Sequence, residues 1–202
     1  MTVNISAITD GWVQSSGVVG LSTSDSDPMF STSRSGGNNV RHGVYEFSLA
    51  TIPTGVTITS ATLKLTTSRF ISNTGGNPGE ISVYGFTGDG SITTADFGTD
   101  PNPAATTSFG SFPSGVGAGS TPSGSILDFD FSELTSITAA NASGSDIMGL
   151  RTQTISFVDF QIAAMEHPTL TGPTLEVTYI PEPSSVLLLT LAGLAGLKHR
   201  RR

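Results

Sequence analysis

FSLATIPTGVTITSATLKL, the stretch from Phe47 to Leu65, decides the fold class of this chain. Its second part, Ala61–Leu65, alternates apolar and polar residues, which is the period-two pattern of a strand with one buried face. Pro53 and Gly55 precede that run, and both residue types favour turns because Pro fixes φ and Gly tolerates positive φ. The stretch therefore predicts a strand, a turn and a second strand that returns the chain to the core.

The same alternation recurs along the first 180 residues. Further strands are predicted at Val44–Leu49, Ile81–Tyr84, Leu127–Phe131, Ile155–Ile162 and Leu175–Tyr179, with weaker ones at Val3–Ile8, Gly11–Gln14 and Ile147–Arg151. The run Ile155–Ile162 is long and largely apolar, which favours a central place in a sheet. Turn-rich segments separate the strands, the longest from Thr99 to Gly124. Helix is sparse, and Thr93 and Ser132 are each placed to cap a short helical turn.

These patterns predict an all-β domain over residues 1–180, a jelly-roll-like β-sandwich, followed by a short hydrophobic helix over residues 181–202. A length of 180 residues suits one sandwich domain. Abundant Gly, Ser and Thr, with 12% charged residues, suit short strands and turns better than surface helices.

The stretch from Phe47 to Leu65 also resembles the DNRLRE-type and related carbohydrate-binding-like modules. In those modules a strand ending in Phe-x-Leu is followed by Ile-Pro-x-Gly and then by Ile-x-x-Ala-x-Leu. This chain departs from the family after the middle strand, where the family has a Trp-rich segment, because Trp12 is its only tryptophan. The resemblance implies a β-sandwich, and it supports a carbohydrate-binding function less strongly.

Composition limits the classes of function. Residues 1–180 hold fifteen of the sixteen acidic residues and five of the nine basic ones, so the domain is acidic. Phosphate binding needs a basic patch, so we expect no nucleic-acid partner. The chain has no cysteine, which excludes disulfides, thiolate catalysis and Cys-ligated zinc.

The C-terminal segment has a different composition from the domain. It begins with the signal Pro181, Glu182 and Pro183 and ends with the basic residues Lys198, Arg200, Arg201 and Arg202. Between them lies a twelve-residue apolar run whose large residues are Val186, Leu187, Leu188, Leu189, Leu191, Leu194 and Leu197. A permanent span needs about 20 apolar residues, yet the run has no polar stripe to face water, as a surface helix would. We therefore expect a sorting or anchoring segment, with its basic end on the cytoplasmic side.

This three-part order resembles the PEP-CTERM sorting signal of Gram-negative bacteria. The resemblance implies an exported protein that is held in the inner membrane, cleaved by an exosortase near the Pro-Glu-Pro motif, and passed to the cell surface or the extracellular matrix. Such proteins begin with a secretory signal. This chain opens MTVNISAITD, without a basic or an apolar region, so we expect that signal to be missing from it.

Residues that could support catalysis form no recognisable set, so we expect no enzyme. His42 and His167 sit in no motif, and a solvated loop position is the favoured interpretation of each; His199 lies in the tail. Asp128 and Asp130 point to one side of a strand, as a glycosidase pair could, but a solvent-facing strand explains them better.

Calcium and sugar are the remaining ligands to weigh. Asp25, Asp27 and Asp89 are oxygen ligands of the kind that calcium prefers, but the loop from Asp89 to Asp96 is an incomplete EF-hand, and a turn that caps a short helix is favoured. We therefore expect no cofactor, with a structural calcium as an alternative. The candidate sugar-stacking aromatics are Trp12, Tyr45, Tyr84 and Phe112. A lone Trp is more often a packing residue than a ligand platform.

The sequence thus predicts an exported, non-enzymatic surface or extracellular-matrix protein, with exosortase and the inner membrane as transient partners. The alternative is a carbohydrate-binding module, calcium-assisted or not, whose partner would be an extracellular polysaccharide.

Overall fold

A computed structural model describes residues 1–21, 29–34, 40–68, 72–73, 81–98, 107–111, 123–132, 134–143, 146–154 and 158–181 of the 202. The expected C-terminal helix lies outside these ranges. Neither of the two helices within them is long and apolar enough to cross a lipid bilayer.

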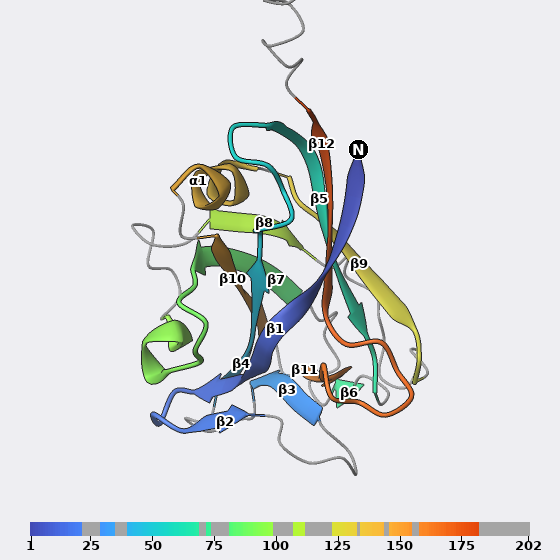
Figure 1. Ribbon diagram of the computed structural model, residues 1–202. Helices are drawn as coiled ribbons and strands as arrows, with labels where there is room; N and C mark the ends of the chain where they lie inside the picture. The colour runs from blue at the N-terminus through green and yellow to red at the C-terminus, as the bar shows by residue number, and fades with distance from the viewer. Residues whose placement is uncertain are drawn as a thin grey trace, which may run out of the picture.

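The protein is all-β, and its strands form an antiparallel sheet that curls on itself (Figure 1). The strands are β1 (Thr2–Gln14), β2 (Val19–Leu21), β3 (Met29–Arg34), β4 (Val40–Ser48), β5 (Thr57–Thr66), β6 (Ser72–Asn73), β7 (Ile81–Thr87), β8 (Thr107–Ser111), β9 (Ile126–Asp130), β10 (Ile147–Thr154), β11 (Val158–Ala163) and β12 (Thr174–Ile180). A single 3₁₀ turn, η1 (Thr94–Phe97), and one helix, α1 (Thr135–Ser143), complete the described elements.

Strand β1 joins two groups of strands. Its first half, Thr2–Ser6, pairs with β12, which pairs with β5, and β5 pairs with β9. Its second half, from Ala7 to Gln14, pairs with β4, and β4 pairs with β10 and then β7. The register shifts between Ala7 and Thr9, and this bulge lets one strand turn from the first group into the second (Figure 1).

The main core lies between the two groups, since both supply its side chains. Its largest fully buried members are Tyr45, Phe47, Leu49, Leu63, Leu65, Ile137 and Met148. A second, smaller cluster of Val13, Val44 and Ile92 lies on the other face of β1 and β4, where the segment Gly88–Gly98 covers the sheet. The sheet is therefore buried on both faces at β4, which explains why β4 is buried at consecutive positions rather than alternate ones.

The alternating runs are the part of the fold that the sequence predicted best. Ala61, Leu63 and Leu65 are buried on β5, Leu127 and Phe129 are buried on β9, and the turn at Pro53 contains Gly55 at φ 82°. The two weak strands near the N-terminus are one bulged strand, β1, because the polar pair at Thr9 and Asp10 continues the pairing.

Other expectations about the elements were wrong or lie outside the described residues. The apolar run at Ile155–Ile162 is described from Val158, as β11, and β11 pairs with β3 and the two-residue β6, so it is not central. Strand β8 falls in the turn-rich stretch Thr99–Gly124, and β3, from Ser31 onward, falls in a second turn-rich stretch, Ser31–Asn39. Helix α1 begins at Thr135 and runs for nine residues, longer than the short turn expected after Ser132.

Candidate functional site

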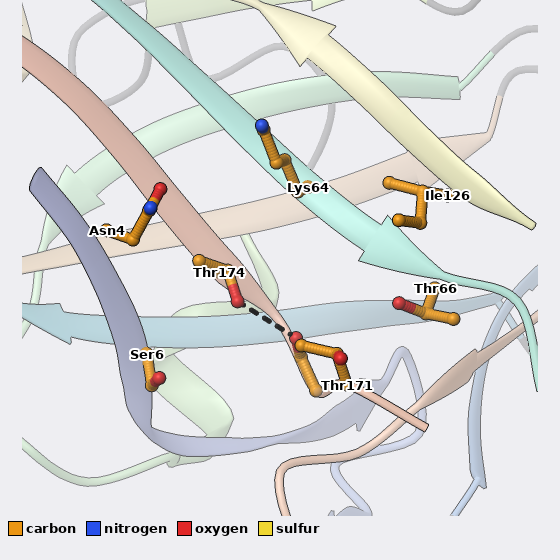
Figure 2. Close-up of a pocket in the computed structure, with 8 residues that line it drawn as sticks. Asn4, Ser6, Lys64, Thr66, Ile126, Thr171 and Thr174 are labelled. Carbon is orange, nitrogen blue, oxygen red and sulfur yellow. Dashed lines mark hydrogen bonds between the residues drawn. The ribbon is translucent and has the colours of Figure 1, made fainter. Parts of the chain in front are cut away.

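A pocket of about 370 Å³ opens on the outer face of the β1–β12–β5–β9 group (Figure 2). Its lining residues come from all four strands and from the loop before β12. They are Asn4 and Ser6 from β1, Lys64 and Thr66 from β5, Ile126 from β9, Thr174 from β12, and Thr171 and Gly172 from the loop before β12. This volume lies near the lower end of the roughly 300–1,000 Å³ typical of ligand pockets.

The pocket exists because the strands of this group end at different levels. Thr174, the first residue of β12, pairs with Lys64, whereas β5 and β9 continue to the pair Thr66 and Ile126. On the other side, β1 leaves the group at its bulge after Ala7. The loop residues Thr171 and Gly172 also line the pocket, at the end where the chain enters β12, and Thr171 is labelled in Figure 2.

An ion pair neutralises the cation of the pocket. Lys64 Nζ lies 2.9 Å from Glu176 Oε2, and each side chain is 34% exposed. The hydrogen bond to Glu176 is the main cause that raises the pKa of Lys64, and the charges of Asp128 and Asp130 add to it. Acidic groups thus outnumber the cation on this face, which disfavours anionic ligands.

The other pocket residues offer hydroxyl groups, an amide and one exposed aliphatic side chain, Ile126. The Thr174 hydroxyl donates to the Gly172 carbonyl oxygen at 3.2 Å, which fixes the corner where the loop enters β12 (Figure 2). The lining residues thus offer hydrogen-bonding groups beside a small apolar surface.

A buried carboxyl lies behind the loop that ends the pocket. Asp10 is 3% exposed, and its Oδ2 accepts a hydrogen bond of 2.6 Å from the Met165 amide. Its Oδ1 is buried without a hydrogen-bond partner. Burial is the largest influence on this group and raises the pKa of Asp10 from 3.8 to about 7; the Met165 amide lowers it, and the nearby charge of Glu166 raises it.

A second set of buried polar groups fastens Gly88–Gly98 to the sheet. Glu46 Oε1 accepts from the Asp89 amide at 3.1 Å at one end of the segment. At the other end His42 Nδ1 lies 2.8 Å from the Phe97 carbonyl oxygen, and Arg151 Nη1 donates to the Asp96 carbonyl at 3.3 Å. The His42 ring also stacks on Phe97, with ring centroids 4.4 Å apart. These side chains therefore hold both ends of the segment against the sheet.

The structure corrects one histidine interpretation. His42 is 2% exposed within β4, so a solvated loop position is wrong for it; the covering segment comes from 55 residues further along the chain. His167 does lie in a loop, where its Nδ1 accepts from the amides of Thr169 and Leu170. His199 lies outside the described residues.

Among the carboxylates that the sequence singled out, the structure describes Asp128, Asp130 and Asp96. Asp128 and Asp130 are exposed on the outer face of β9, and Asp130 accepts a hydrogen bond of 2.7 Å from Thr62. Asp96 and Thr93 form a reciprocal capping box at the start of η1, which confirms a capped turn at that position. Within the described ranges no three acidic or histidine side chains gather as a metal site. Asp25 and Asp27 lie outside those ranges.

Of the described aromatic candidates, Tyr45 is buried, and Trp12 and Tyr84 are half-buried. The Trp12 ring packs over Gly20, and the Arg41 guanidinium lies 4.4 Å from its centroid. The Tyr84 ring lies 5.5 Å from the Arg151 guanidinium. Trp12 is thus a packing residue, as predicted. Phe112 is outside the described residues.

Of the predicted sorting residues, Pro181 is described; it is exposed and directly follows β12. Glu182, Pro183, the apolar run from Val186 to Leu197 and the basic end from Lys198 to Arg202 lie outside the described residues.

Sequence reasoning missed Asp10, Glu46, Arg151 and the pocket. The sequence predicts one strand that ends at Ile8 and another that begins at Gly11, so Asp10 falls between them. The bulge in β1 interrupts the alternation of apolar and polar residues, and the pattern therefore does not show that the strand continues. The pocket depends on where four strands end relative to one another, which no local pattern encodes. No protein-family model matches this chain, and no curated protein matches it.

Proposed function

We propose that this is an exported, non-enzymatic surface or extracellular-matrix protein that an exosortase releases from a transient membrane anchor. The observation that carries the proposal is the order of Pro181-Glu182-Pro183, an apolar run and a basic end, with which the sequence closes. A membrane-embedded protease needs an extended, accessible backbone, and two prolines one residue apart keep the backbone extended.

The position of the last strand supports this assignment. Strand β12 ends at Ile180, and its neighbour β1 begins beside it, with the Tyr179 amide donating to the Met1 carbonyl oxygen at 2.8 Å. The sheet is therefore paired up to the residue before the proposed signal. In the first 180 residues we propose the finer architecture of a jelly-roll-like β-sandwich, supported by a core filled from both strand groups.

The contacts of the candidate catalytic residues support a non-enzymatic role. His42 Nδ1 lies within hydrogen-bond distance of the Phe97 carbonyl oxygen, and Asp130 accepts a hydrogen bond from Thr62. Asp96 accepts a hydrogen bond from the Thr93 amide in the cap of η1. Each of these contacts stabilises a turn, a strand pair or a covering segment. The acidic domain likewise supports partners other than nucleic acid.

The alternative, a carbohydrate-binding module that stacks sugars on aromatic rings, has less support. Tyr45 is buried, and the rings of Trp12 and Tyr84 each lie beside an arginine. Binding of an extracellular polysaccharide through these rings would require the arginines to move.

The test is to express the chain behind a secretory signal in cells with and without an exosortase. We expect membrane-bound protein in cells without the enzyme and released protein in cells with it. Replacement of Pro181, Glu182 and Pro183 by Ala should keep the protein membrane-bound in both. Equal release of the triple variant and the parent would contradict the proposal.

A further inference from the structure

The loop between β11 and β12, residues 164–173, is attached to the sheet at a buried carboxyl. The Met165 amide donates to Asp10 Oδ2 at 2.6 Å. Within the loop, the His167 amide donates to the Ala164 carbonyl and the amides of Thr169 and Leu170 donate to His167 Nδ1. The loop is thus folded on itself, and the bond to Asp10 is what ties its first half to β1.

The same backbone that Asp10 holds is pressed against the end of the pocket. Gly172 lines the pocket, and a Cβ placed on it would lie 2.6 Å from Met165 Cα and 3.0 Å from the Met165 nitrogen. Because the two segments are in backbone contact, movement of Met165 changes the packing of Gly172 at the end of the pocket. The carboxyl, the Met165 amide and the end of the pocket therefore form one continuous chain of contacts.

We propose that Asp10 and residues 164–172 form a proton-controlled latch, in which protonation of Asp10 holds the loop closed and its ionisation loosens the loop at the end of the pocket. This goes beyond the function proposed above and does not depend on the sorting segment.

The charge balance around Asp10 gives the direction of the effect. The buried carboxylate has an unpartnered Oδ1, and water can reach that oxygen if the loop lifts. Of the titratable groups that face it, Tyr45 on β4 stays neutral because burial raises its pKa, and Glu166 in the loop has the same sign of charge. His167 lies in the loop and bonds to loop amides. The bond from the Met165 amide favours the ionised carboxylate, but burial outweighs it, so ionisation on balance favours the open loop.

Proton linkage gives the direction and the size of the change in loop opening with pH. In the closed state Asp10 has a pKa of about 7, and in an open, solvated state it would return towards 3.8. The opening equilibrium should therefore rise by roughly tenfold per pH unit between those values and level off above pH ~7. The loop is tight in acid and loosens as the pH approaches neutrality.

Amide hydrogen exchange on the full chain, corrected for intrinsic exchange rates, tests the latch. Between pH 5 and 7 the protection of the Met165 amide should fall by roughly 10- to 100-fold, and at each pH it should stay well below that of the Leu63 amide in β5, which exchanges through wider unfolding. In Asp10→Asn the Met165 protection should lose this dependence on pH. Asp128→Asn, the same change at an exposed strand position, should behave like the parent.

Two results would overturn the proposal. Equal protection of the Met165 and Leu63 amides at every pH would mean that the loop opens only in global unfolding, and this comparison needs no variant. Persistence of the Met165 slope in Asp10→Asn would mean that another group controls the loop.

Discussion

Gly43 is a residue at which the core has no room for a side chain. A Cβ there would lie 2.7 Å from both Thr152 Oγ1 and the Tyr45 hydroxyl oxygen. These two oxygens form a hydrogen bond of 3.2 Å with each other. We predict that Gly43→Ala lowers the free energy of unfolding by about 1–3 kcal/mol, since overpacking forces buried neighbours to shift. Denaturant unfolding measures this.

Gly17 provides the comparison for Gly43. Its φ is 82°, and nothing lies within 4 Å of a Cβ built on it, so Gly17→Ala should cost about 1 kcal/mol through backbone strain alone. If Gly43→Ala costs no more than Gly17→Ala, then Tyr45 and Thr152 are not packed as described.

The buried charges are the residues that sequence reasoning could not locate. The partner that buries Asp10 is 155 residues away along the chain, and the partner of Glu46 is 43 residues away. A polar residue in a strand pattern is ordinarily read as solvent-facing, because burying a charge is costly. The burial of Asp10 and Glu46 therefore depends on tertiary contacts that a local pattern does not contain.

At the scale of elements, η1 is stabilised by its first residues. The Thr93 hydroxyl accepts from the Ala95 amide at 3.2 Å, and the Asp96 carboxylate accepts from the Thr93 amide at 2.6 Å. We predict that Thr93→Ala destabilises the protein by roughly 1 kcal/mol, the usual cost of losing a cap. Thr94→Ala, at the next position, should have little effect. Thermal unfolding of the two variants tests this prediction. Equal losses of stability in Thr93→Ala and Thr94→Ala would contradict the capping role.

Strands with one buried face were predictable from their alternation, and β4 was predicted over Val44–Leu49, whereas β3 and β8 were not predicted. The run Ala61–Leu65 alternates because its outer face meets solvent, and β9 behaves in the same way. Strand β4 is covered on both faces, and β3 and β8 are built from Ser, Thr, Gly, Phe, Met and Arg, so their composition resembles that of turns. Pairing in those strands is set by neighbouring strands rather than by their own residues.

At the scale of the whole molecule, the domain should fold without the segment from Pro181 onward. Strand β12 completes its pairing with β5 at Ile180. We predict that a chain ending at Ile180 unfolds cooperatively in a thermal scan and keeps the sheet content of the full chain. Loss of cooperative unfolding would mean that the apolar run belongs to the core.

The fold should also be independent of calcium. Asp89 and Asp96 bond to backbone amides in their own turn. Since a metal stabilises a fold in proportion to its binding to the native state, a chelator should leave the melting temperature unchanged. A large drop on adding a chelator, reversed by calcium, would point to a structural calcium site.

The central claim is that Pro181–Arg202 is a sorting signal that is cut after export, and the mass of the released protein tests it most directly. The chain is expressed behind a secretory signal in cells that carry an exosortase, and intact-mass spectrometry locates the C-terminus of the protein in the medium. We predict a C-terminus near Pro181–Pro183, with Leu187–Arg202 absent. A released protein that still carries Leu187–Arg202 would contradict the account.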